Sequence, residues 1–170
     1  MTENKIYSDD PLLRFKDTEV PPQRTKHDID GALAAFEVEE ILWKWTPHLI
    51  ETGEPGEIYV AFKVQEMTNG VLIRVPVRID CPAIWDRANK LARTPEKRLE
   101  RVNWRISMRI MYHFIYNSLN TLYAMRSSKV VAFLGYIQTG NGQQVKDRLI
   151  PALRQLEALP ERIEVIPPSE

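Results

Sequence analysis

Residues 57–80, EIYVAFKVQEMTNGVLIRVPVRID, decide the fold, because two alternating apolar–polar segments flank an Asn-Gly pair. Asn-Gly is the preferred pair for a type I′ hairpin turn, in which both central residues need positive φ. Turn chemistry and side-chain alternation therefore predict an antiparallel hairpin with one apolar face. With Asn69-Gly70 as the loop, the apolar face carries the pairs Val60/Ile79, Phe62/Val77 and Val64/Val75, and the other face carries Gln65/Arg74 and Ala61/Arg78.

The second strand of this hairpin contains Pro76. Proline has no N–H to donate, which predicts a position at a sheet edge or at a bulge. An isolated hairpin is only marginally stable in water. We therefore expect helices to cover the apolar face, and a further strand to come from this chain or from a second copy.

The segment before the hairpin is expected to contain an N-terminal helix over residues 28–46. Asp28 or Asp30 is its expected N-cap, and Thr46-Pro47 is its expected end, because the residue before proline disfavours the α region. Residues 1–27 contain Pro21-Pro22 and no apolar period, which is typical of an extended or mobile arm.

The segment after the hairpin is expected to contain one long helix. Thr94 as N-cap with Pro95 at the first helical position fits a helix start, and no glycine or proline follows until Gly135. We expect the helix to run to about Met125. Shorter elements are expected around it: a helical turn at 83–91, a helix from 129 capped by Ser127 or Ser128, a strand at 136–139, and a last helix at 143–159 kinked by Pro151.

These elements predict an α+β fold, in which a small antiparallel hairpin sheet packs against the long helix with flanking N- and C-terminal helices. The expected organisation is a flexible arm at 1–27, a single domain at 28–160 and an irregular tail at 161–170. The chain has 170 residues, which is one domain's worth. It contains no apolar run long enough for a membrane span and no secretory leader pattern, so we expect a cytoplasmic protein without membrane contact.

Charge is balanced over the whole chain but not along it. Lys+Arg and Asp+Glu are equal at 23 each. Residues 1–60 carry 6 basic and 13 acidic side chains, whereas residues 87–129 carry 10 basic and 2 acidic ones. Such asymmetry indicates either that the two halves neutralise each other in the fold or that the basic half faces an acidic partner.

The basic stretch 87–129 carries an Arg–Tyr stripe on the expected long helix. At about 100° per residue, its members lie close to one line along the helix. The row is Arg98, Arg101, Arg105 and Arg109, followed by Tyr112, Tyr116 and Tyr123. Arginines spaced three and four apart repel one another, so the row needs compensating anions.

Two interpretations of the stripe stay open. In the first, the stripe binds nucleic acid: the arginines hold phosphates, Tyr112 and Tyr116 stack on bases, and the hairpin adds Lys63, Arg74 and Arg78. In the second, Glu37, Glu39, Glu40 or the N-terminal arm pair with the arginines, and the protein is a protein–protein adaptor or a small structural subunit.

Catalysis is not indicated by any motif. The single cysteine, Cys81, excludes a disulfide framework and a cysteine-based zinc site within the chain, and His27, His48 and His113 share no metal-ligand spacing. Gly140-Asn141-Gly142 lacks the spacing of a phosphate-binding loop. We expect no cofactor and no metal, and an enzyme built from carboxylates that meet only in the fold is the weakest of three functional hypotheses.

Several weak motifs occur in a characteristic order. They are NGVLIRVP at 69–76, Trp104-Arg105, FLGYI at 133–137, NGQQV at 141–145, IPAL at 150–153 and Ile166-Pro167-Pro168. In this order the chain resembles, over about residues 30–168, a group of small proteins of unknown function from phages, prophages and mobile elements. The resemblance implies a role in phage or mobile-element DNA metabolism.

Together these patterns predict a non-catalytic accessory protein that binds single- or double-stranded DNA. The predicted contact residues are Arg98, Arg101, Arg105, Arg109, Arg74, Arg78, Lys63, Tyr112 and Tyr116. Dimerisation through the apolar flanks of the long helix is a further expectation.

Overall fold

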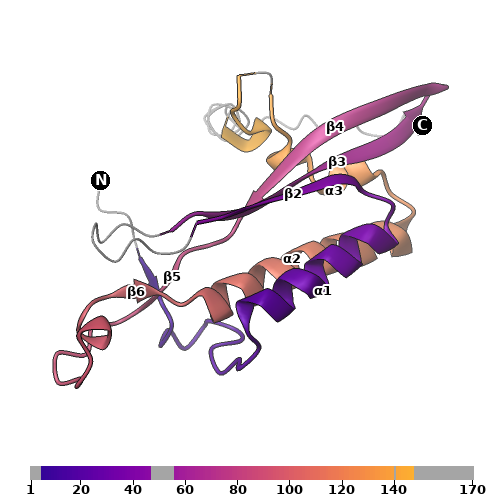
Figure 1. Cartoon of the computed structure of the whole chain (residues 1–170). Helices are drawn as coiled ribbons and strands as arrows, with labels where there is room; N and C mark the ends of the chain where they lie inside the picture. The colour runs from indigo at the N-terminus through magenta and orange to yellow at the C-terminus, as the bar shows by residue number, and fades with distance from the viewer. Residues whose placement is uncertain (1–4, 47–55, 140, 148–170) are drawn as a thin grey trace, which may run out of the picture.

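The computed structural model describes residues 5–46, 56–139 and 141–147. It has an α+β architecture, with two three-stranded sheets and two principal helices. The helices lie side by side and cover one face of the larger sheet (Figure 1). The predicted fold class is confirmed.

The larger sheet contains β2 (Glu39–Trp45), β3 (Ile58–Thr68) and β4 (Val71–Asp80), in the order β2-β3-β4. The predicted hairpin register is confirmed throughout, for example in the pairs Val60/Ile79 and Gln65/Arg74. Asn69 and Gly70 have φ of 51° and 78°, as a type I′ turn requires. β4 is an edge strand, which explains how the sheet accommodates Pro76. The third strand comes from the same chain.

The smaller sheet contains β1 (Ile6–Tyr7), β5 (Ile84–Asp86) and β6 (Arg101–Val102). β1 is parallel to β5, and β6 is antiparallel to it. The helical turn expected at 83–91 is therefore wrong, since its first residues form β5. The sequence between residues 5 and 20, expected to be an arm without structure, contributes a strand to this sheet.

Helix α1 spans Pro22–Ala35, so it begins six residues before the expected start. Pro22 occupies the first helical position, where a missing N–H costs nothing. The two aspartates expected to cap the helix lie within it instead. Asp28 contacts Arg24 and Arg109, and Asp30 accepts hydrogen bonds from Lys26 and from the Trp43 indole.

Helix α1 also ends earlier than expected, and residues 39–45 form a strand instead of continuing the helix. Glu37 adopts a left-handed φ of 55°, and the Val38 N–H donates to the Leu33 carbonyl at 3.3 Å, which closes a Schellman-type end. The following segment alternates between partly buried and exposed residues, and its tryptophans favour a pleated surface. Trp43 and Trp45 pair with β3, while Leu42 remains exposed.

Helix α2 spans Trp104–Met125 and ends where the sequence predicts, but its first residue lies nine positions after the expected Pro95. Pro95 instead begins a short 3-10 helix, η1 (Pro95–Arg98). Asn103 is the N-cap of α2: its side-chain oxygen accepts from the Ile106 N–H at 3.3 Å, and its amide donates to Asp86. The pairing of β6 with β5 therefore interrupts the expected long helix.

Two short elements follow α2. Helix α3 (Lys129–Ala132) is capped by Ser128, as predicted, and η2 (Leu134–Tyr136) follows it. The strand expected at 136–139 is reduced to isolated bridges at Ile137 and Gln138. Most of the helix expected at 143–159, with Pro151, and the tail at 161–170 lie outside the described residues.

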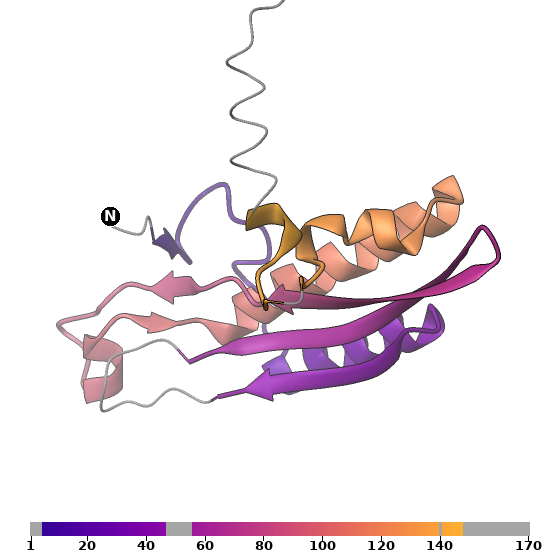
Figure 2. The ribbon, with the colours of Figure 1, turned by 90° about the horizontal axis from the view of Figure 1, so that it is seen from above.

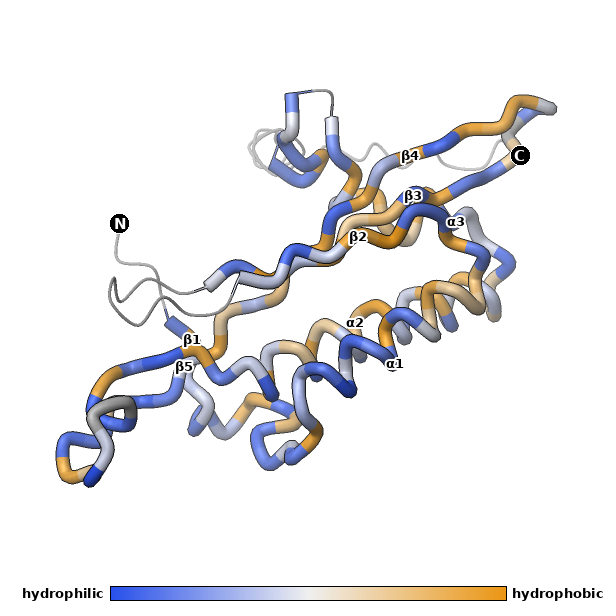
Figure 3. The backbone as a smooth tube through the Cα atoms, in the orientation of Figure 1, coloured by the Kyte–Doolittle hydropathy of each residue, from blue (hydrophilic) through white to orange (hydrophobic). Residues whose placement is uncertain are grey.

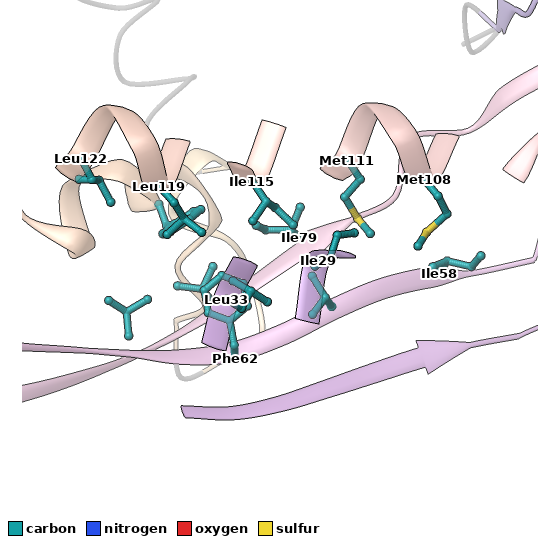
Figure 4. Packing of buried hydrophobic residues seen from close by; sticks show 14 residues of the cluster. Ile29, Leu33, Ile58, Phe62, Ile79, Met108, Met111, Ile115, Leu119 and Leu122 are labelled. Carbon is teal, nitrogen blue, oxygen red and sulfur yellow. The ribbon is translucent and has the colours of Figure 1, made fainter. Parts of the chain in front are cut away.

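The core lies between the larger sheet and the two helices. Side chains from α2 and α1 meet the inner face of β3 and β4 (Figure 4). Hydrophobic residues recur along both helices and the three strands, whereas the loop between β5 and β6 is mostly hydrophilic (Figure 3). The fully buried side chains include Ile29, Leu33, Val60, Val64, Val77, Met108, Met111, Ile115, Leu119 and Phe133.

Candidate functional site

The predicted Arg–Tyr stripe does not form one row. Arg98 ends η1 and Arg101 lies in β6, so neither belongs to the long helix. Only Arg105 and Arg109 lie on α2 with the tyrosines. The prediction of four guanidiniums in one row along a helix is wrong, because it depended on a helix that starts at residue 94.

The predicted hairpin cations are held in ion pairs. Lys63 Nζ lies 2.6 Å from a Glu40 oxygen, and Arg74 Nε lies 3.7 Å from a Glu39 oxygen. One of the two interpretations of the stripe pairs these glutamates with the arginines of the long helix. They instead neutralise Lys63 and Arg74 of the hairpin, because residues 39–45 form a strand beside β3.

Arg78 is the most engaged of these cations. Its guanidinium lies 2.7 Å from a Glu57 oxygen and 2.6 Å from an Asp80 oxygen, and it stacks 3.8 Å from the centroid of the Tyr59 ring. Partial burial would lower the pKa of Arg78, but its bonds to Asp80 and Glu57 outweigh that and raise it. Arg78 is thus part of a local charge network, which also includes Lys44 bound to Glu57 at 2.8 Å.

Two arginines of the expected stripe also have carboxylate partners. Arg109 lies 3.4 Å from Asp28 of α1, and its guanidinium is 4.7 Å from the Tyr112 ring centroid. Arg101 lies 3.7 Å from Asp86 of β5. Partly exposed pairs of this kind contribute little to stability, but each places a carboxylate where a phosphate would have to approach.

Tyr112 and Tyr116 pack against other rings of the protein, whereas Tyr123 is exposed. Tyr112 and Tyr116 stack on each other with centroids 5.5 Å apart, and Tyr112 meets His113 edge-on at 5.1 Å. Phe15 covers the His113 ring at 4.0 Å. Burial, and to a lesser degree Arg109, lowers the pKa of His113. Tyr116 keeps an exposed fraction of 43%.

A basic lobe, defined as residues 87–100 between β5 and β6, projects from one end of the molecule (Figures 1 and 2). Lys90, Arg93 and Lys97 are exposed there, and no described carboxylate lies within ion-pair distance of them. The Arg98 Nε donates to the Ala92 carbonyl at 2.9 Å and meets no acid among the described side chains. Arg105, in the first turn of α2, is likewise exposed and without a described carboxylate partner.

Two acidic groups near the lobe, Glu100 and Asp9, are already engaged. Glu100 accepts hydrogen bonds from Lys5 at 2.8 Å and from Tyr7 at 3.0 Å, and these two bonds lower its pKa. Asp9 binds Arg87 at 2.8 Å. The sequence pattern signals the lobe only as part of the basic stretch 87–129. Of the lobe's cations, Arg98 is among the predicted contact residues, and Lys90, Arg93 and Lys97 are not.

The opposite end of the molecule carries exposed apolar side chains that sequence reasoning missed. At the end of the hairpin, Met67 and Val71 are each 63% exposed, Leu72 is 46% and Ile73 is 39% exposed. Tyr123, Met125 and Val131 are also exposed. The available signal was the run Val71-Leu72-Ile73, since three successive apolar residues make both faces of a strand apolar.

The described residues contain no group of three or more His, Cys, Asp or Glu side chains that could hold a metal ion. Cys81 lies largely buried, which raises the pKa of its thiol. Among the described helices, none is both long and apolar enough to cross a membrane.

Comparison with protein-family models, curated proteins and solved structures finds no significant match for this chain.

Proposed function

We propose that the protein is a non-catalytic accessory protein that binds nucleic acid through its basic lobe and Arg105. The observation that carries this proposal is the location of the cations that lack a described carboxylate partner. Five of them lie in the lobe or in the first turn of α2, whereas Lys63, Arg74 and Arg78 are neutralised by acids of the same sheet. The other cations without a described carboxylate partner lie elsewhere and do not form such a group: Arg14, Lys16, Arg126, Lys129 and Lys146. The proposed phosphate contacts are Lys90, Arg93, Lys97, Arg98 and Arg105.

The physical basis is the low cost of bringing these cations to a phosphate backbone. A cation already paired with a carboxylate must give up that partner. Lys90, Arg93 and Lys97 have no carboxylate partner among the described side chains, so no described ion pair opposes their contact with a phosphate. Neutralising phosphates releases the ions condensed on the nucleic acid, which favours binding at low salt. The lobe projects from the body of the protein, so a backbone can approach it without meeting the acids of β2.

The proposed context is phage or mobile-element DNA metabolism, which rests on the order of motifs described above. The lobe and Arg105 present no base-stacking ring comparable to Tyr112 and Tyr116, which pack on each other. The proposed contacts are therefore to the phosphate backbone, with little dependence on base sequence.

A second candidate function is that of a protein–protein adaptor or small structural subunit. The ion pairs of the hairpin cations favour it, because they give those cations a structural role. The exposed apolar side chains of residues 67–73 also favour it, because contiguous apolar surface is typical of protein contacts.

The test is fluorescence anisotropy with labelled single- and double-stranded DNA at low salt. The first variant, Lys90→Gln/Arg93→Gln/Lys97→Gln/Arg105→Gln, removes four cations that make no described contact, so the fold is preserved. The matched control, Lys26→Gln/Lys44→Gln/Lys63→Gln/Arg74→Gln, removes the same charge from cations held in ion pairs. Circular dichroism verifies the fold of both.

The proposal expects the wild-type protein to bind DNA, the lobe variant to lose binding, and the control to keep most of it. Equal loss in both variants would mean that overall charge, and not the lobe, governs binding. Binding to vesicles containing anionic lipid without binding to DNA would assign the lobe to a membrane surface and overturn the proposal. Absence of any binding by the wild-type protein would favour the adaptor.

A further inference from the structure

The end of β4 is an open sheet edge. β4 is the last strand in the order β2-β3-β4, and its outer side is covered only in part. Gln138 donates to the Pro76 carbonyl at 2.9 Å, and the Gln144 amide donates to the Arg78 carbonyl at 2.9 Å. No hydrogen bond from the described residues reaches the outer side of β4 between Val71 and Val75.

The hairpin register identifies which backbone groups are open. Thr68 and Val71 flank a two-residue loop, so they exchange hydrogen bonds with each other, and such pairs alternate along an antiparallel ladder. Residues 72, 74, 76 and 78 therefore direct their backbone groups away from β3. Those of Pro76 and Arg78 have partners, and those of Leu72 and Arg74 have none among the described residues.

The side chains beside these open groups are apolar. Val71, Leu72 and Ile73 are 63%, 46% and 39% exposed, and the hairpin end projects beyond the ends of α1 and α2 in both views (Figures 1 and 2). Natural edge strands are usually protected by charge, proline, a bulge or a covering segment. β4 has such protection from Arg74 onward, and the three residues before it have none from the part of the chain that the structure describes.

We propose that the hairpin end is the interface with a second copy of this chain, formed by antiparallel pairing of β4 with β4 around a two-fold axis at Leu72. Pairing cannot extend to Pro76, because Gln138 already occupies its carbonyl. An axis at Leu72 keeps the two strands clear of that position. It lets the N–H of each Leu72 donate to the Leu72 carbonyl of the other copy. It also places Val71 opposite Ile73 of the second copy.

This register satisfies the backbone and the side chains together. The open groups of Leu72 gain partners, and the exposed side chains of Val71 and Ile73 cover each other across the axis. A two-fold contact uses the same patch on both copies, so one apolar run is sufficient. The chain has equal numbers of acidic and basic residues, so net charge does not oppose association.

Leu72→Pro tests the backbone pairing directly. Like the natural Pro76 on the same strand, it removes an outward-facing N–H, so no hydrogen bond of the hairpin ladder is lost. Sedimentation velocity over a concentration series is expected to show a wild-type dimer. Leu72→Pro is expected to weaken that dimer about tenfold or more, because each of two symmetry-related hydrogen bonds is lost. Leu72→Ala keeps the N–H and is expected to weaken the dimer less.

Disulfide formation tests the register. Residues facing each other in a non-hydrogen-bonded pair have Cα atoms about 4.5 Å apart, within the range that a disulfide spans. In a Cys81→Ser background, an equimolar mixture of Val71→Cys and Ile73→Cys is expected to cross-link faster than either variant alone. A wild-type monomer up to high micromolar concentration would overturn the proposal. A dimer with neither the Leu72→Pro effect nor preferential cross-linking would overturn it as well.

Discussion

Arg109 of α2 lies 3.4 Å from Asp28 of α1, and this contact ties the two helices that cover the sheet. The same guanidinium stands over the Tyr112 ring at 4.7 Å. A residue that sequence reasoning assigned to phosphate binding therefore has a structural partner on each side. Its neighbour one turn earlier, Arg105, has no such carboxylate partner among the described side chains.

Arg109→Gln is therefore expected to lower the free energy of unfolding by about 1 kcal/mol or less, because the pair is only partly buried. Arg105→Gln is expected to leave stability unchanged and to weaken DNA binding. Urea denaturation and anisotropy on both variants check this. The opposite pattern, with Arg109 important for DNA and Arg105 for stability, would contradict the assignment of roles.

Asn103→Ala is expected to destabilise the protein by about 0.5–2 kcal/mol, because Asn103 caps α2 and its amide also bonds to Asp86. Thr94→Ala is the control, since Thr94 precedes η1 without a side-chain capping bond. Thermal or urea unfolding should separate the two variants. Equal losses would argue against a helix start at residue 104.

Two glycines provide a matched pair. Gly31 lies within α1 with open space around it, so Gly31→Ala is expected to stabilise the protein by about 0.5–1 kcal/mol. Gly70 has φ of 78° in the hairpin turn, and Gly70→Ala is expected to destabilise it by about 1 kcal/mol, because alanine is strained in that region. Chemical denaturation measures both, and a destabilising Gly31→Ala would contradict the helical assignment.

His113 should make stability depend on pH near neutrality. Burial, with a smaller contribution from Arg109, lowers its pKa below the ordinary 6.5, so the unfolded chain takes up the proton first as pH falls. The contribution of neutral His113 to the free energy of unfolding is complete above about pH 6.5. It is lost as pH falls from there through the pKa of His113 in the folded protein. His113→Gln is expected to flatten the stability–pH curve between about pH 7 and 5. If the slope of stability against pH were unchanged in the variant, His113 would be excluded as the origin of the pH dependence.

The sequence was most informative where local chemistry and long-range pairing agree. Asn69-Gly70 sets the turn, and the alternation on both sides sets the register, so the hairpin could be predicted residue by residue. Met125 was a predictable helix end, and Ser128 was a predictable cap. In these places no distant segment competes with the local signal.

Prediction failed where tertiary pairing overrides a helical pattern. Apolar spacing over 33–45 fits a helix, but β3 offers an edge that Trp43 and Trp45 pair with, and Glu37 adopts the left-handed conformation that ends α1. Thr94-Pro95 is a valid start signal, yet it begins only η1 because β6 pairs with β5. The candidate site changed with the second of these errors, because the stripe required an uninterrupted helix.

The salt dependence of DNA binding tests the role of the basic lobe most directly. The measurement compares the slope of log K against log salt concentration for the wild-type protein and for Lys90→Gln/Arg93→Gln/Lys97→Gln/Arg105→Gln. If these four cations neutralise phosphates of duplex DNA, the slope falls in magnitude by about 3 to 4 in the variant. A variant that binds with the wild-type slope would contradict the account and place the phosphate contacts elsewhere on the protein.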